Sequence, residues 1–429
     1  MSMGKLTLPA GEKSVQNRAC AGRTDLTEVT VPEGVEVIET KAFFRCTALR
    51  RLYLPLSLRH IDMKAFEGCP LEEIYYAGSQ AQWREVEISP VMSGSITAAC
   101  KHFQGGSSPA PAARQLPDSG PALTEQVRRL LAGGGDGRLH VVVPNLAMDG
   151  VLTKPGDLSL LIFPQGGTLL LDTGYKANWP WVRAFLLSVG LRRVDTLALS
   201  HGDEDHVSNG MAIARLLLEE QSGSIGRLWW TGQPYGTIVP QLADYLAGQG
   251  VCVDTHVRAG RTEEIEGVGL EVLGPTEEDM QEDSQDGEVR NAQSMMLKLT
   301  YGKSTYLTCG DLYARQEERV IRRLGSRLRA DVSKTNHHGG FTSNTPAWQE
   351  AVNSRIFFSC ASDMGSTPMV RQLLARGAEY YSVGCHGLLL LSASADGIWQ
   401  VQTQFQQGLH CLQRVNEYRR YRHSAAAYG

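Results

Sequence analysis

The chain has 429 residues, of which 42% are hydrophobic and 21% charged, and its formal net charge at pH 7 is −4. This composition excludes a disordered or fibrous chain, and the near-balance of charge excludes a generally basic nucleic-acid coat. No apolar run approaches the ~20 residues of a membrane helix, and the first residues lack the basic and apolar segments of a secretory signal. We therefore expect a soluble, cytoplasmic protein with no membrane partner.

The first part of the chain contains an internal repeat. Pro9, Pro32 and Pro55 each follow a short apolar strand at a step of 23 residues, and Phe43 and Phe66 repeat at the same step. One such unit cannot bury its apolar face, whereas stacked units can. The pattern resembles the BspA-like leucine-rich repeats over residues 5–88. The resemblance implies a short β-rich module at residues 1–104 and a surface suited to a protein partner.

The composition changes after the repeats. Residues 105–121, GGSSPAPAARQLPDSGP, are typical of a flexible linker. Apolar strands and amphipathic helices then alternate over residues 122–410, which predicts a layered α/β domain. Residues 411–429 contain EYRRYRH and are expected to form a basic tail. We expect strands at 139–145, 157–163, 167–174, 194–200, 269–275, 295–302, 304–311, 330–336 and 355–360, and helices at 181–191, 209–220, 240–250, 315–325 and 368–377.

The densest group of potential metal ligands follows the apolar strand VDTLALS. His201, Asp203, Asp205 and His206 lie within six residues of one another. Alternate residues of an extended loop face the same side, so His201 and Asp203 can share one metal ion. Asp205 and His206 can then reach a second ion nearby. Imidazole and carboxylate groups are ligands for both Zn²⁺ and Mn²⁺.

Two later strands end in further candidate ligands. Asp311 follows STYLTCG, and His337 and His338 follow ADVSKTN, with no indication of which histidine is the ligand. Asp203, Asp205 and Asp311 together carry a charge of −3 when ionised. With a bridging hydroxide they balance two divalent cations, which predicts a centre with two metal ions.

In this order the segments LLLDTG, HGDEDH, TCGDL and HHGG resemble the metallo-β-lactamase fold, an αββα sandwich, and within it the hydrolase domain of the ComEC-type competence proteins. The resemblance covers about residues 139–405. It implies that Asp205 binds or orients the attacking hydroxide as the catalytic residue and that Asp172 orients a metal-binding histidine. The implied ligands of two divalent ions, Zn or Mn, are His201, Asp203, Asp205, His206, Asp311 and one of His337 and His338.

The histidine of the fold's usual third motif is not apparent. Asn291 and Ser294 stand in that region, so water or substrate is expected to complete the coordination there. We expect Asn291, Ser294 and His386 to contact substrate. His256 is an alternative ligand, but its strand-like surroundings favour a structural role.

We therefore expect a metal-dependent hydrolase, with a ComEC-like phosphodiesterase or nuclease that uses a metal-activated hydroxide as the favoured function. Nucleic acid or a small phosphodiester is the expected substrate. One alternative is a hydrolase of a small ester, lactone or cyclic phosphate. Another is a protein-binding repeat protein with a residual or structural metal site. Two charged segments give opposite indications about a nucleic-acid substrate. The basic segment ARQEERVIRRLGSRLRA could attract a polyanion, whereas the acidic segment TEEDMQEDSQDGE would repel it.

Overall fold

The computed structural model describes residues 4–9, 11–83, 85–88, 96, 99–103, 120–146, 156–233, 235–282, 287–340, 342–360 and 367–405. The chain divides into two compact units, Met1–Gln115 with His423–Gly429, and Leu116–Arg422. The predicted linker lies outside the described residues, except for Gly120 and Pro121 at the start of helix α3 (Gly120–Gly133). The predicted basic tail lies outside them entirely. Within the described ranges, no helix has the length and apolar character needed to cross a membrane.

The smaller unit is built from the 23-residue repeat. Successive repeats contribute strands to two parallel sheets, with the orders β1-β3-β5-β7-β9 and β2-β4-β6-β8. The elements are β1 (Lys5–Thr7), β2 (Ser14–Val15), β3 (Glu28–Thr30), β4 (Val37–Ile38), β5 (Arg51–Leu54), β6 (His60–Ile61), β7 (Glu73–Tyr76), α1 (Gln80–Trp83), β8 (Glu87–Ile88) and β9 (Cys100–Phe103).

Equivalent side chains of successive repeats stack on one another in this unit. The rings of Phe43 and Phe66 are buried, lie 5.0 Å apart and are almost parallel. Cys20 takes the corresponding place in the first repeat and is also buried, so a smaller side chain fills the core of the terminal unit. Outside the core, the ring of Tyr75 lies 4.7 Å from that of Tyr53 and 4.5 Å from that of His102.

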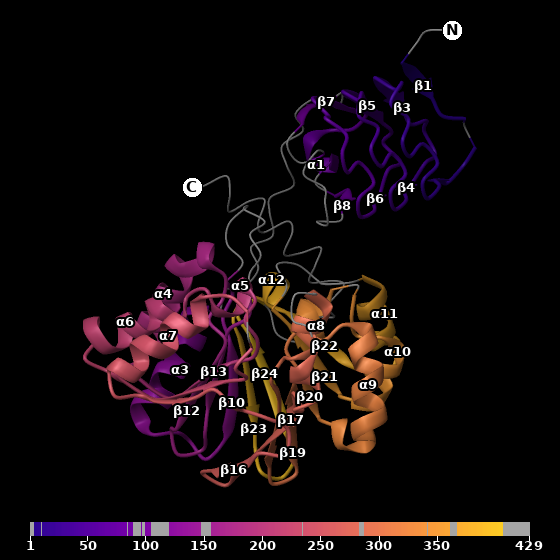
Figure 1. Ribbon diagram of the computed structural model, residues 1–429. Coiled ribbons are helices and arrows are strands. Elements are labelled where there is room, and N and C mark those ends of the chain that lie inside the picture. Colours follow the sequence, from indigo (N-terminus) through magenta and orange to yellow (C-terminus); the bar gives the residue numbers. More distant parts are fainter. Residues whose placement is uncertain are drawn as a thin grey trace. The chain divides into compact units, whose positions relative to one another are not determined.

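The larger unit has four layers. Its two sheets have the strand orders β15-β14-β13-β12-β11-β10-β23-β24 and β16-β17-β18-β19-β20-β21-β22. Helices α3, α4 (Trp179–Ser188), α6 (Gly210–Arg215) and α7 (Ile238–Gly248) cover the first sheet. Helices α9 (Ala314–Leu324), α10 (Pro346–Val352) and α11 (Thr367–Ala375) cover the second (Figure 1).

The strands of the first sheet are β10 (Leu139–Val143), β11 (Ser159–Ile162), β12 (Thr168–Leu171), β13 (Arg193–Leu199), β14 (Ser224–Trp230), β15 (Cys252–Asp254), β23 (Leu389–Ala393) and β24 (Trp399–Thr403). Those of the second are β16 (Thr262–Ile265), β17 (Val268–Gly274), β18 (Met296–Tyr301), β19 (Ser304–Thr308), β20 (Val332–Lys334), β21 (Ile356–Ser359) and β22 (Glu379–Ser382). Further short helices are α5 (Glu204–Val207), α8 (Gly287–Ala292) and α12 (Val383–His386).

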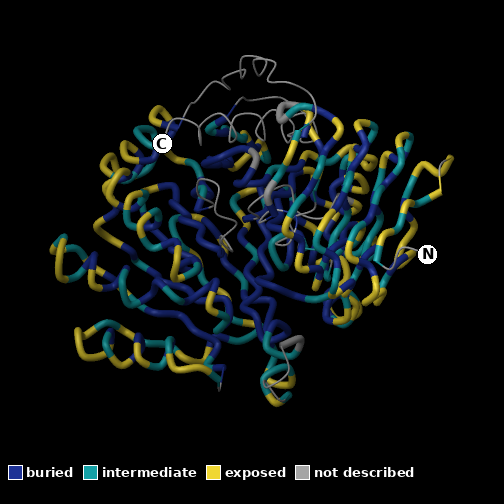
Figure 2. Tube along the Cα trace, turned by 90° about the horizontal axis from the view of Figure 1, so that it is seen from above, coloured by how far each residue is buried: buried dark blue, intermediate teal, exposed yellow. Residues whose placement is uncertain are grey.

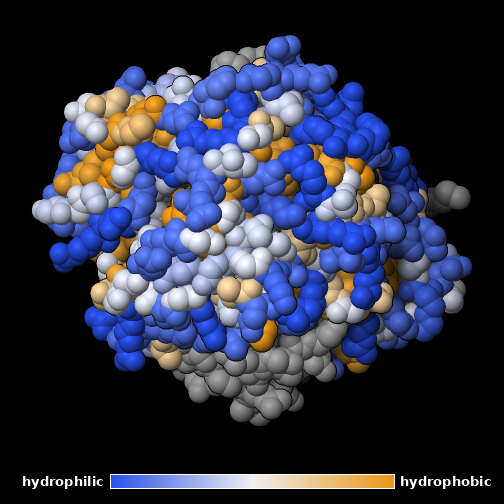
Figure 3. Space-filling model, turned by 90° about the horizontal axis from the view of Figure 1, so that it is seen from below, coloured by the Kyte–Doolittle hydropathy of each residue, from blue (hydrophilic) through white to orange (hydrophobic). Residues whose placement is uncertain are grey.

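Alternating side chains fill the space between the layers. Leu139, Val141 and Val143 of β10 pack into the core between the two sheets, whereas Val142 packs against the helices. Figure 2 shows these strands buried while the helices keep exposed outer faces. The face drawn in Figure 3 is mostly hydrophilic, with apolar residues in scattered spots. The structure thus confirms the predicted αββα sandwich preceded by a β-rich repeat module.

Candidate metal centre

The candidate ligands meet at one edge of the two sheets because of the strand directions. The strands β12 and β13 are parallel, as are β19 and β20, so the segments that follow them leave at the same edges. These segments carry Asp172, the HGDEDH loop, Asp311 and the HHGG loop. Strand β11 runs antiparallel to β12, with Ser159 opposite Leu171, so the residues before β11 also lie at this edge. Asp157 is thereby brought to the same place.

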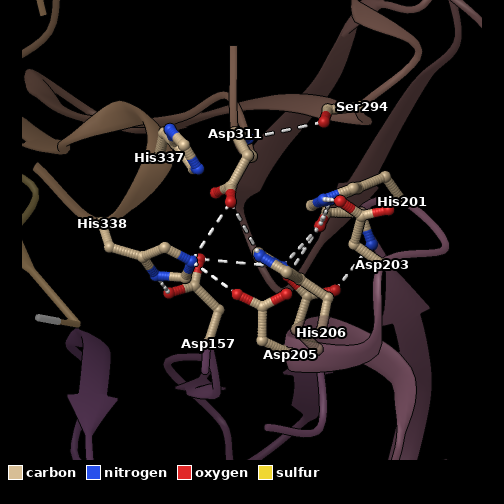
Figure 4. Close-up of polar contacts among 12 residues, drawn as sticks. Asp157, His201, Asp203, Asp205, His206, Ser294, Asp311, His337 and His338 are labelled. Atoms are coloured by element: carbon tan, nitrogen blue, oxygen red, sulfur yellow. Dashed lines mark hydrogen bonds and ion pairs between the residues drawn. The ribbon is translucent and has the colours of Figure 1, made fainter. Parts of the chain in front are cut away.

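Four of the predicted ligands converge at the centre of this edge. The Nε2 atom of His338 lies 3.0 Å from Oδ2 of Asp205 and 3.1 Å from Oδ2 of Asp311. The same Asp311 oxygen lies 3.2 Å from Nε2 of His206. Four ligands placed tetrahedrally around Zn²⁺ have donor atoms about 3.3 Å apart. The convergence in Figure 4 therefore has the dimensions of a metal site.

The two imidazole rings at the centre are those of His206 and His338, and a buried carboxylate contacts the Nδ1 atom of each. Asp172 Oδ2 lies 2.8 Å from Nδ1 of His206 and also accepts a hydrogen bond from the Ser200 hydroxyl at 2.7 Å. Asp157 Oδ1 lies 3.0 Å from Nδ1 of His338. A histidine that donates its Nδ1 proton to a carboxylate presents the lone pair of Nε2 to a metal ion. The two carboxylates therefore turn both Nε2 atoms toward the same point.

Asp157 was not among the residues predicted from the sequence, and its own oxygens could also reach a metal. One oxygen each from Asp157 and Asp311 and one nitrogen each from His206 and His338 lie within 4.8 Å of one another. The two oxygens of Asp157 already have partners, however, because Oδ2 forms an ion pair with Lys334 and Oδ1 meets His338. We therefore favour Asp205 over Asp157 as the fourth group around the centre.

The acidic and basic groups of this cluster stabilise one another's charged forms. Burial opposes ionisation of Asp311, but the imidazolium groups of His338 and His206 lower its pKa well below the ordinary value. Burial also opposes ionisation of Asp157, but the Lys334 ammonium and the His338 and His206 imidazolium groups together outweigh it and lower the pKa of this carboxyl. Burial opposes protonation of His206, yet nearby carboxylates, first among them Asp311, raise its pKa well above the ordinary value. Divalent cations would take over the balancing of these carboxylates.

His201 and Asp203 mark a second position beside the first. The His201 ring lies 4.0 Å from that of His206, and its Nε2 atom is buried without a hydrogen-bond partner. Burial, together with the charge of His206, lowers the pKa of His201 to about 4, so this imidazole is neutral and able to act as a ligand. Asp203 Oδ2 lies 3.9 Å from this nitrogen. The two side chains suit a second metal ion.

The two histidines of the HHGG loop point in different directions. His337 Nδ1 lies 2.5 Å from the Thr342 hydroxyl, and its ring lies against Tyr313. It is His338 that contacts Asp205 and Asp311 in the cluster (Figure 4). Both histidines have positive φ angles, 46° and 55°, which non-glycine residues rarely adopt. The surrounding loop therefore has to hold them in place.

Buried Glu317 on α9 provides that restraint. Its carboxylate accepts hydrogen bonds from the Asn336 side chain at 2.8 Å and from the backbone N–H groups of Asn344 and Thr345 at 2.5 and 2.9 Å. Asn336 immediately precedes the two histidines. The sequence offered no direct signal of this role, since Glu317 lies within an arginine-rich helix.

Ser294, Asn291 and His386 were expected to contact substrate, and the structure shows different surroundings for each. The Ser294 hydroxyl accepts a hydrogen bond from the Asp311 backbone at 3.4 Å, so Ser294 supports the Asp311 loop. Asn291 is buried on α8. His386 is buried, and its Nδ1 lies 3.0 Å from the Ser382 carbonyl oxygen. His256 is 68% exposed and forms an ion pair with Glu277, and its role stays a prediction.

A cavity of about 620 Å³ opens beside the HGDEDH loop. This volume lies within the range of small-molecule sites. Asp203 and Asp205 lie on one side, and its other lining residues are Tyr175, Gly202, Glu204, Tyr235, Gly236, Thr237, Ile238, Val239 and Arg290. The cavity therefore reaches two of the candidate ligands, Asp203 and Asp205.

Comparison with known proteins agrees with this architecture. Residues 2–85 match the BspA type leucine-rich repeat region, and residues 156–217 match the metallo-β-lactamase superfamily. The chain thus joins BspA-type repeats to a domain of the metallo-β-lactamase fold, and both predicted resemblances are confirmed. This fold, together with the Asp and His cluster, supports a metal-binding hydrolase.

Among curated relatives, the chain is 27% identical to the competence protein ComA of Neisseria gonorrhoeae over 272 residues, which cover 63% of this chain and 34% of the relative. It is 27% identical to the ComE operon protein 3 of Bacillus subtilis (strain 168) over 195 residues, covering 41% of this chain and 23% of that protein. The chain therefore spans about a third or less of these relatives.

Two solved structures are similar at low identity. The metallo-β-lactamase fold protein YhfI from Bacillus subtilis is 12% identical, with a TM-score of 0.38, and the match covers 60% of this chain and 100% of that chain. A diphosphatase from the PhnP family is 15% identical, with a TM-score of 0.36, and the match covers 63% of this chain and 99% of that chain.

Proposed function

We propose that the larger unit is a metal-dependent phosphodiesterase with nucleic acid or a small phosphodiester as its substrate. The observation that carries the proposal is the convergence of His206, His338, Asp205 and Asp311, with donor atoms 3.0–3.2 Å apart, next to an accessible cavity. The relatives named above, a competence protein and a ComE operon protein, are compatible with a substrate made of nucleic acid.

The same geometry suggests how the ligands are divided between two ions. Asp205, His206, His338 and Asp311 would hold one ion, and His201 and Asp203 would help to hold the other. Two divalent ions would lower the pKa of a water molecule and neutralise charge on the phosphate. Asp205 lies beside both the centre and the cavity, so it is placed to orient that water toward a substrate.

The chain's own residues supply the preorganisation. Asp172 and Asp157 hold the Nδ1 atoms of His206 and His338, so both Nε2 atoms already point to the centre and would bind an ion on losing their protons, without either ring turning. Glu317 holds the loop that carries His338. This rigidity is what a hydrolytic site needs, because groups fixed in advance avoid reorganisation during the reaction.

The two opposing charge runs partly neutralise each other where the structure describes them. Arg319 on the basic helix α9 pairs with Glu282 of the acidic segment at 2.6 Å, and Arg323 pairs with Asp279 at 3.0 Å. The acidic segment is therefore engaged by the arginines and repels a polyanion less than its sequence suggests. These ion pairs remove one argument against a nucleic-acid substrate, and they equally leave less free positive charge on α9.

A substrate panel tests the proposal. The full chain, loaded with Mn²⁺ or Zn²⁺, would be offered bis(p-nitrophenyl) phosphate, single-stranded DNA, a p-nitrophenyl ester and a lactone. We expect about two metal ions per chain and hydrolysis of the phosphodiesters. We expect Asp205→Ala to abolish turnover and Asp244→Ala, at an exposed carboxylate on α7, to retain it.

The other results would assign the alternatives. Hydrolysis of the ester or lactone alone would identify a small-ester hydrolase and refute the phosphodiesterase. Metal binding without turnover of any substrate would leave a repeat protein with a structural metal site.

A further inference from the structure

One wall of the cavity beside the HGDEDH loop is formed by residues that are not candidate metal ligands. Tyr235 and Arg290 form this wall, and the guanidinium carbon of Arg290 lies 4.9 Å from the centre of the Tyr235 ring. Neither residue was predicted from the sequence as part of a site. They lie on separate segments, Tyr235 after β14 and Arg290 on α8.

Buried contacts fix the position of this wall relative to the loop. Gln233, which is 1% exposed, accepts a hydrogen bond from the Gly202 backbone at 2.7 Å and donates one to the Arg290 carbonyl at 2.8 Å. Gly202 also allows Tyr235 to approach, because a Cβ atom there would lie 3.2 Å from the Tyr235 hydroxyl oxygen. These contacts therefore hold Tyr235 and Arg290 against the HGDEDH loop, which carries the candidate ligands.

The charge of Arg290 is directed toward the candidate reaction centre. Its Nε atom lies 3.3 Å from Asp203 Oδ1, and the same oxygen accepts a hydrogen bond from the Tyr235 hydroxyl at 3.1 Å. The other oxygen of Asp203 faces His201. The Arg290 side chain is 31% exposed and lines the cavity, and a guanidinium presents a fork of donors that matches a phosphate group.

We propose that Arg290 and Tyr235 form a phosphate-binding subsite that takes a second phosphate of the substrate, next to the phosphodiester that reacts. The proposal rests on the proposed function, since it assigns the reacting phosphodiester to the neighbouring metal centre. It narrows the substrate class to compounds with at least two phosphate groups, such as oligonucleotides. A cavity of about 620 Å³ has room for more than a single phosphate.

A pair of dinucleotides tests the subsite. Both are thymidine dinucleotides with a phosphorothioate linkage that resists hydrolysis, and only one carries a terminal phosphate. Calorimetric titration of the metal-loaded full chain should show tighter binding of the phosphorylated compound. Arg290→Gln should weaken that binding roughly 10- to 100-fold and leave the other dinucleotide unaffected, because charge-assisted hydrogen bonds to the extra phosphate are lost. Arg290→Lys should retain part of the preference.

A matched variant guards against indirect effects. Arg376→Gln, at an exposed arginine just after α11, should bind both compounds like the wild type. Metal content is measured for each variant, because Asp203 contacts Arg290. Equal affinity of the wild type for the two dinucleotides, or equal weakening of both by Arg290→Gln, would overturn the subsite.

The titration separates the subsite from the proposed function, since no turnover is needed. If the preference depends on Arg290 but bis(p-nitrophenyl) phosphate and DNA are not hydrolysed, the phosphodiesterase assignment fails and the subsite stands. If DNA is hydrolysed but the preference is absent, the subsite fails and the phosphodiesterase stands.

Discussion

Replacing Asp157 with asparagine removes one buried negative charge and leaves the volume of the side chain almost unchanged. Lys334, which is 3% exposed, then loses the carboxylate with which it forms an ion pair. The next carboxylate oxygen, Oδ1 of Asp311, is 3.7 Å away from its ammonium group. Removing one partner of a buried ion pair costs about 3–5 kcal/mol. We therefore expect the free energy of unfolding of the larger unit to fall by about this amount.

The same substitution acts on metal binding through a different contact. The introduced amide can no longer hold Nδ1 of His338 as a carboxylate does, and loss of such an orienting group lowers metal affinity about 10- to 100-fold. Adding Lys334→Met removes the unpaired ammonium. We expect the double variant to recover most of the free energy of unfolding but not the metal affinity.

Two measurements check this expectation. Urea unfolding followed by tryptophan fluorescence gives the stability, and competition with a chromophoric chelator gives the metal affinity. Asp244→Asn, at an exposed carboxylate, is the control and should change neither. Wild-type stability and affinity in Asp157→Asn would refute the assigned contacts, and recovery of both properties in the double variant would refute the orienting role.

Two further predictions concern histidines. His338→Ala should lower the metal content and abolish turnover, whereas His337→Ala should keep the metal because its ring contacts Tyr313 and Thr342; equal metal loss in both variants would contradict this assignment. In the repeats, hydrogen bonds to Asp62 and Glu87 raise the pKa of His60 to about 9. Its stabilising charge is therefore fully present below pH about 6.5 and is lost as the pH rises through about 9. The wild type should exceed His60→Gln in free energy of unfolding by about 1–3 kcal/mol near pH 6 and by almost nothing near pH 10, measured with urea; an equal difference at both pH values would argue against it.

The fold could be predicted because its signals are local and repeated. The 23-residue step indicated stacked repeats, and apolar strands alternating with helices indicated the layered domain. Dense ligand groups such as HGDEDH are visible in a sequence because several donor residues share one loop. The structure places His206, Asp205, Asp311 and His338 together, although their metal-binding roles stay predictions.

The supporting residues could not be predicted in the same way because each contributes a single side chain from a distant segment. Asp157 precedes β11 of the first sheet and Lys334 ends β20 of the second, so only the packing of the two sheets on each other brings their side chains together. The available signal in the sequence was Lys334 itself, because a lysine at the end of a buried strand, just before the HHGG loop, needs a partner of opposite charge. Gln233 and Arg290 meet through one backbone hydrogen bond, which leaves no pattern in the sequence.

The parallel stacking of Phe43 on Phe66 has a consequence for how the repeat unit can change in length. Each strand of its two sheets contacts only the strands of adjacent repeats. An insertion or deletion of one whole repeat preserves every such neighbour relationship. A unit of another length is also accepted where its strands keep their register, since Arg51 pairs with Glu73 at a step of 22 residues and Glu73 pairs with Cys100 at a step of 27. The module can therefore lengthen or shorten by duplication or loss of complete units, while the metallo-β-lactamase-fold domain keeps its own core.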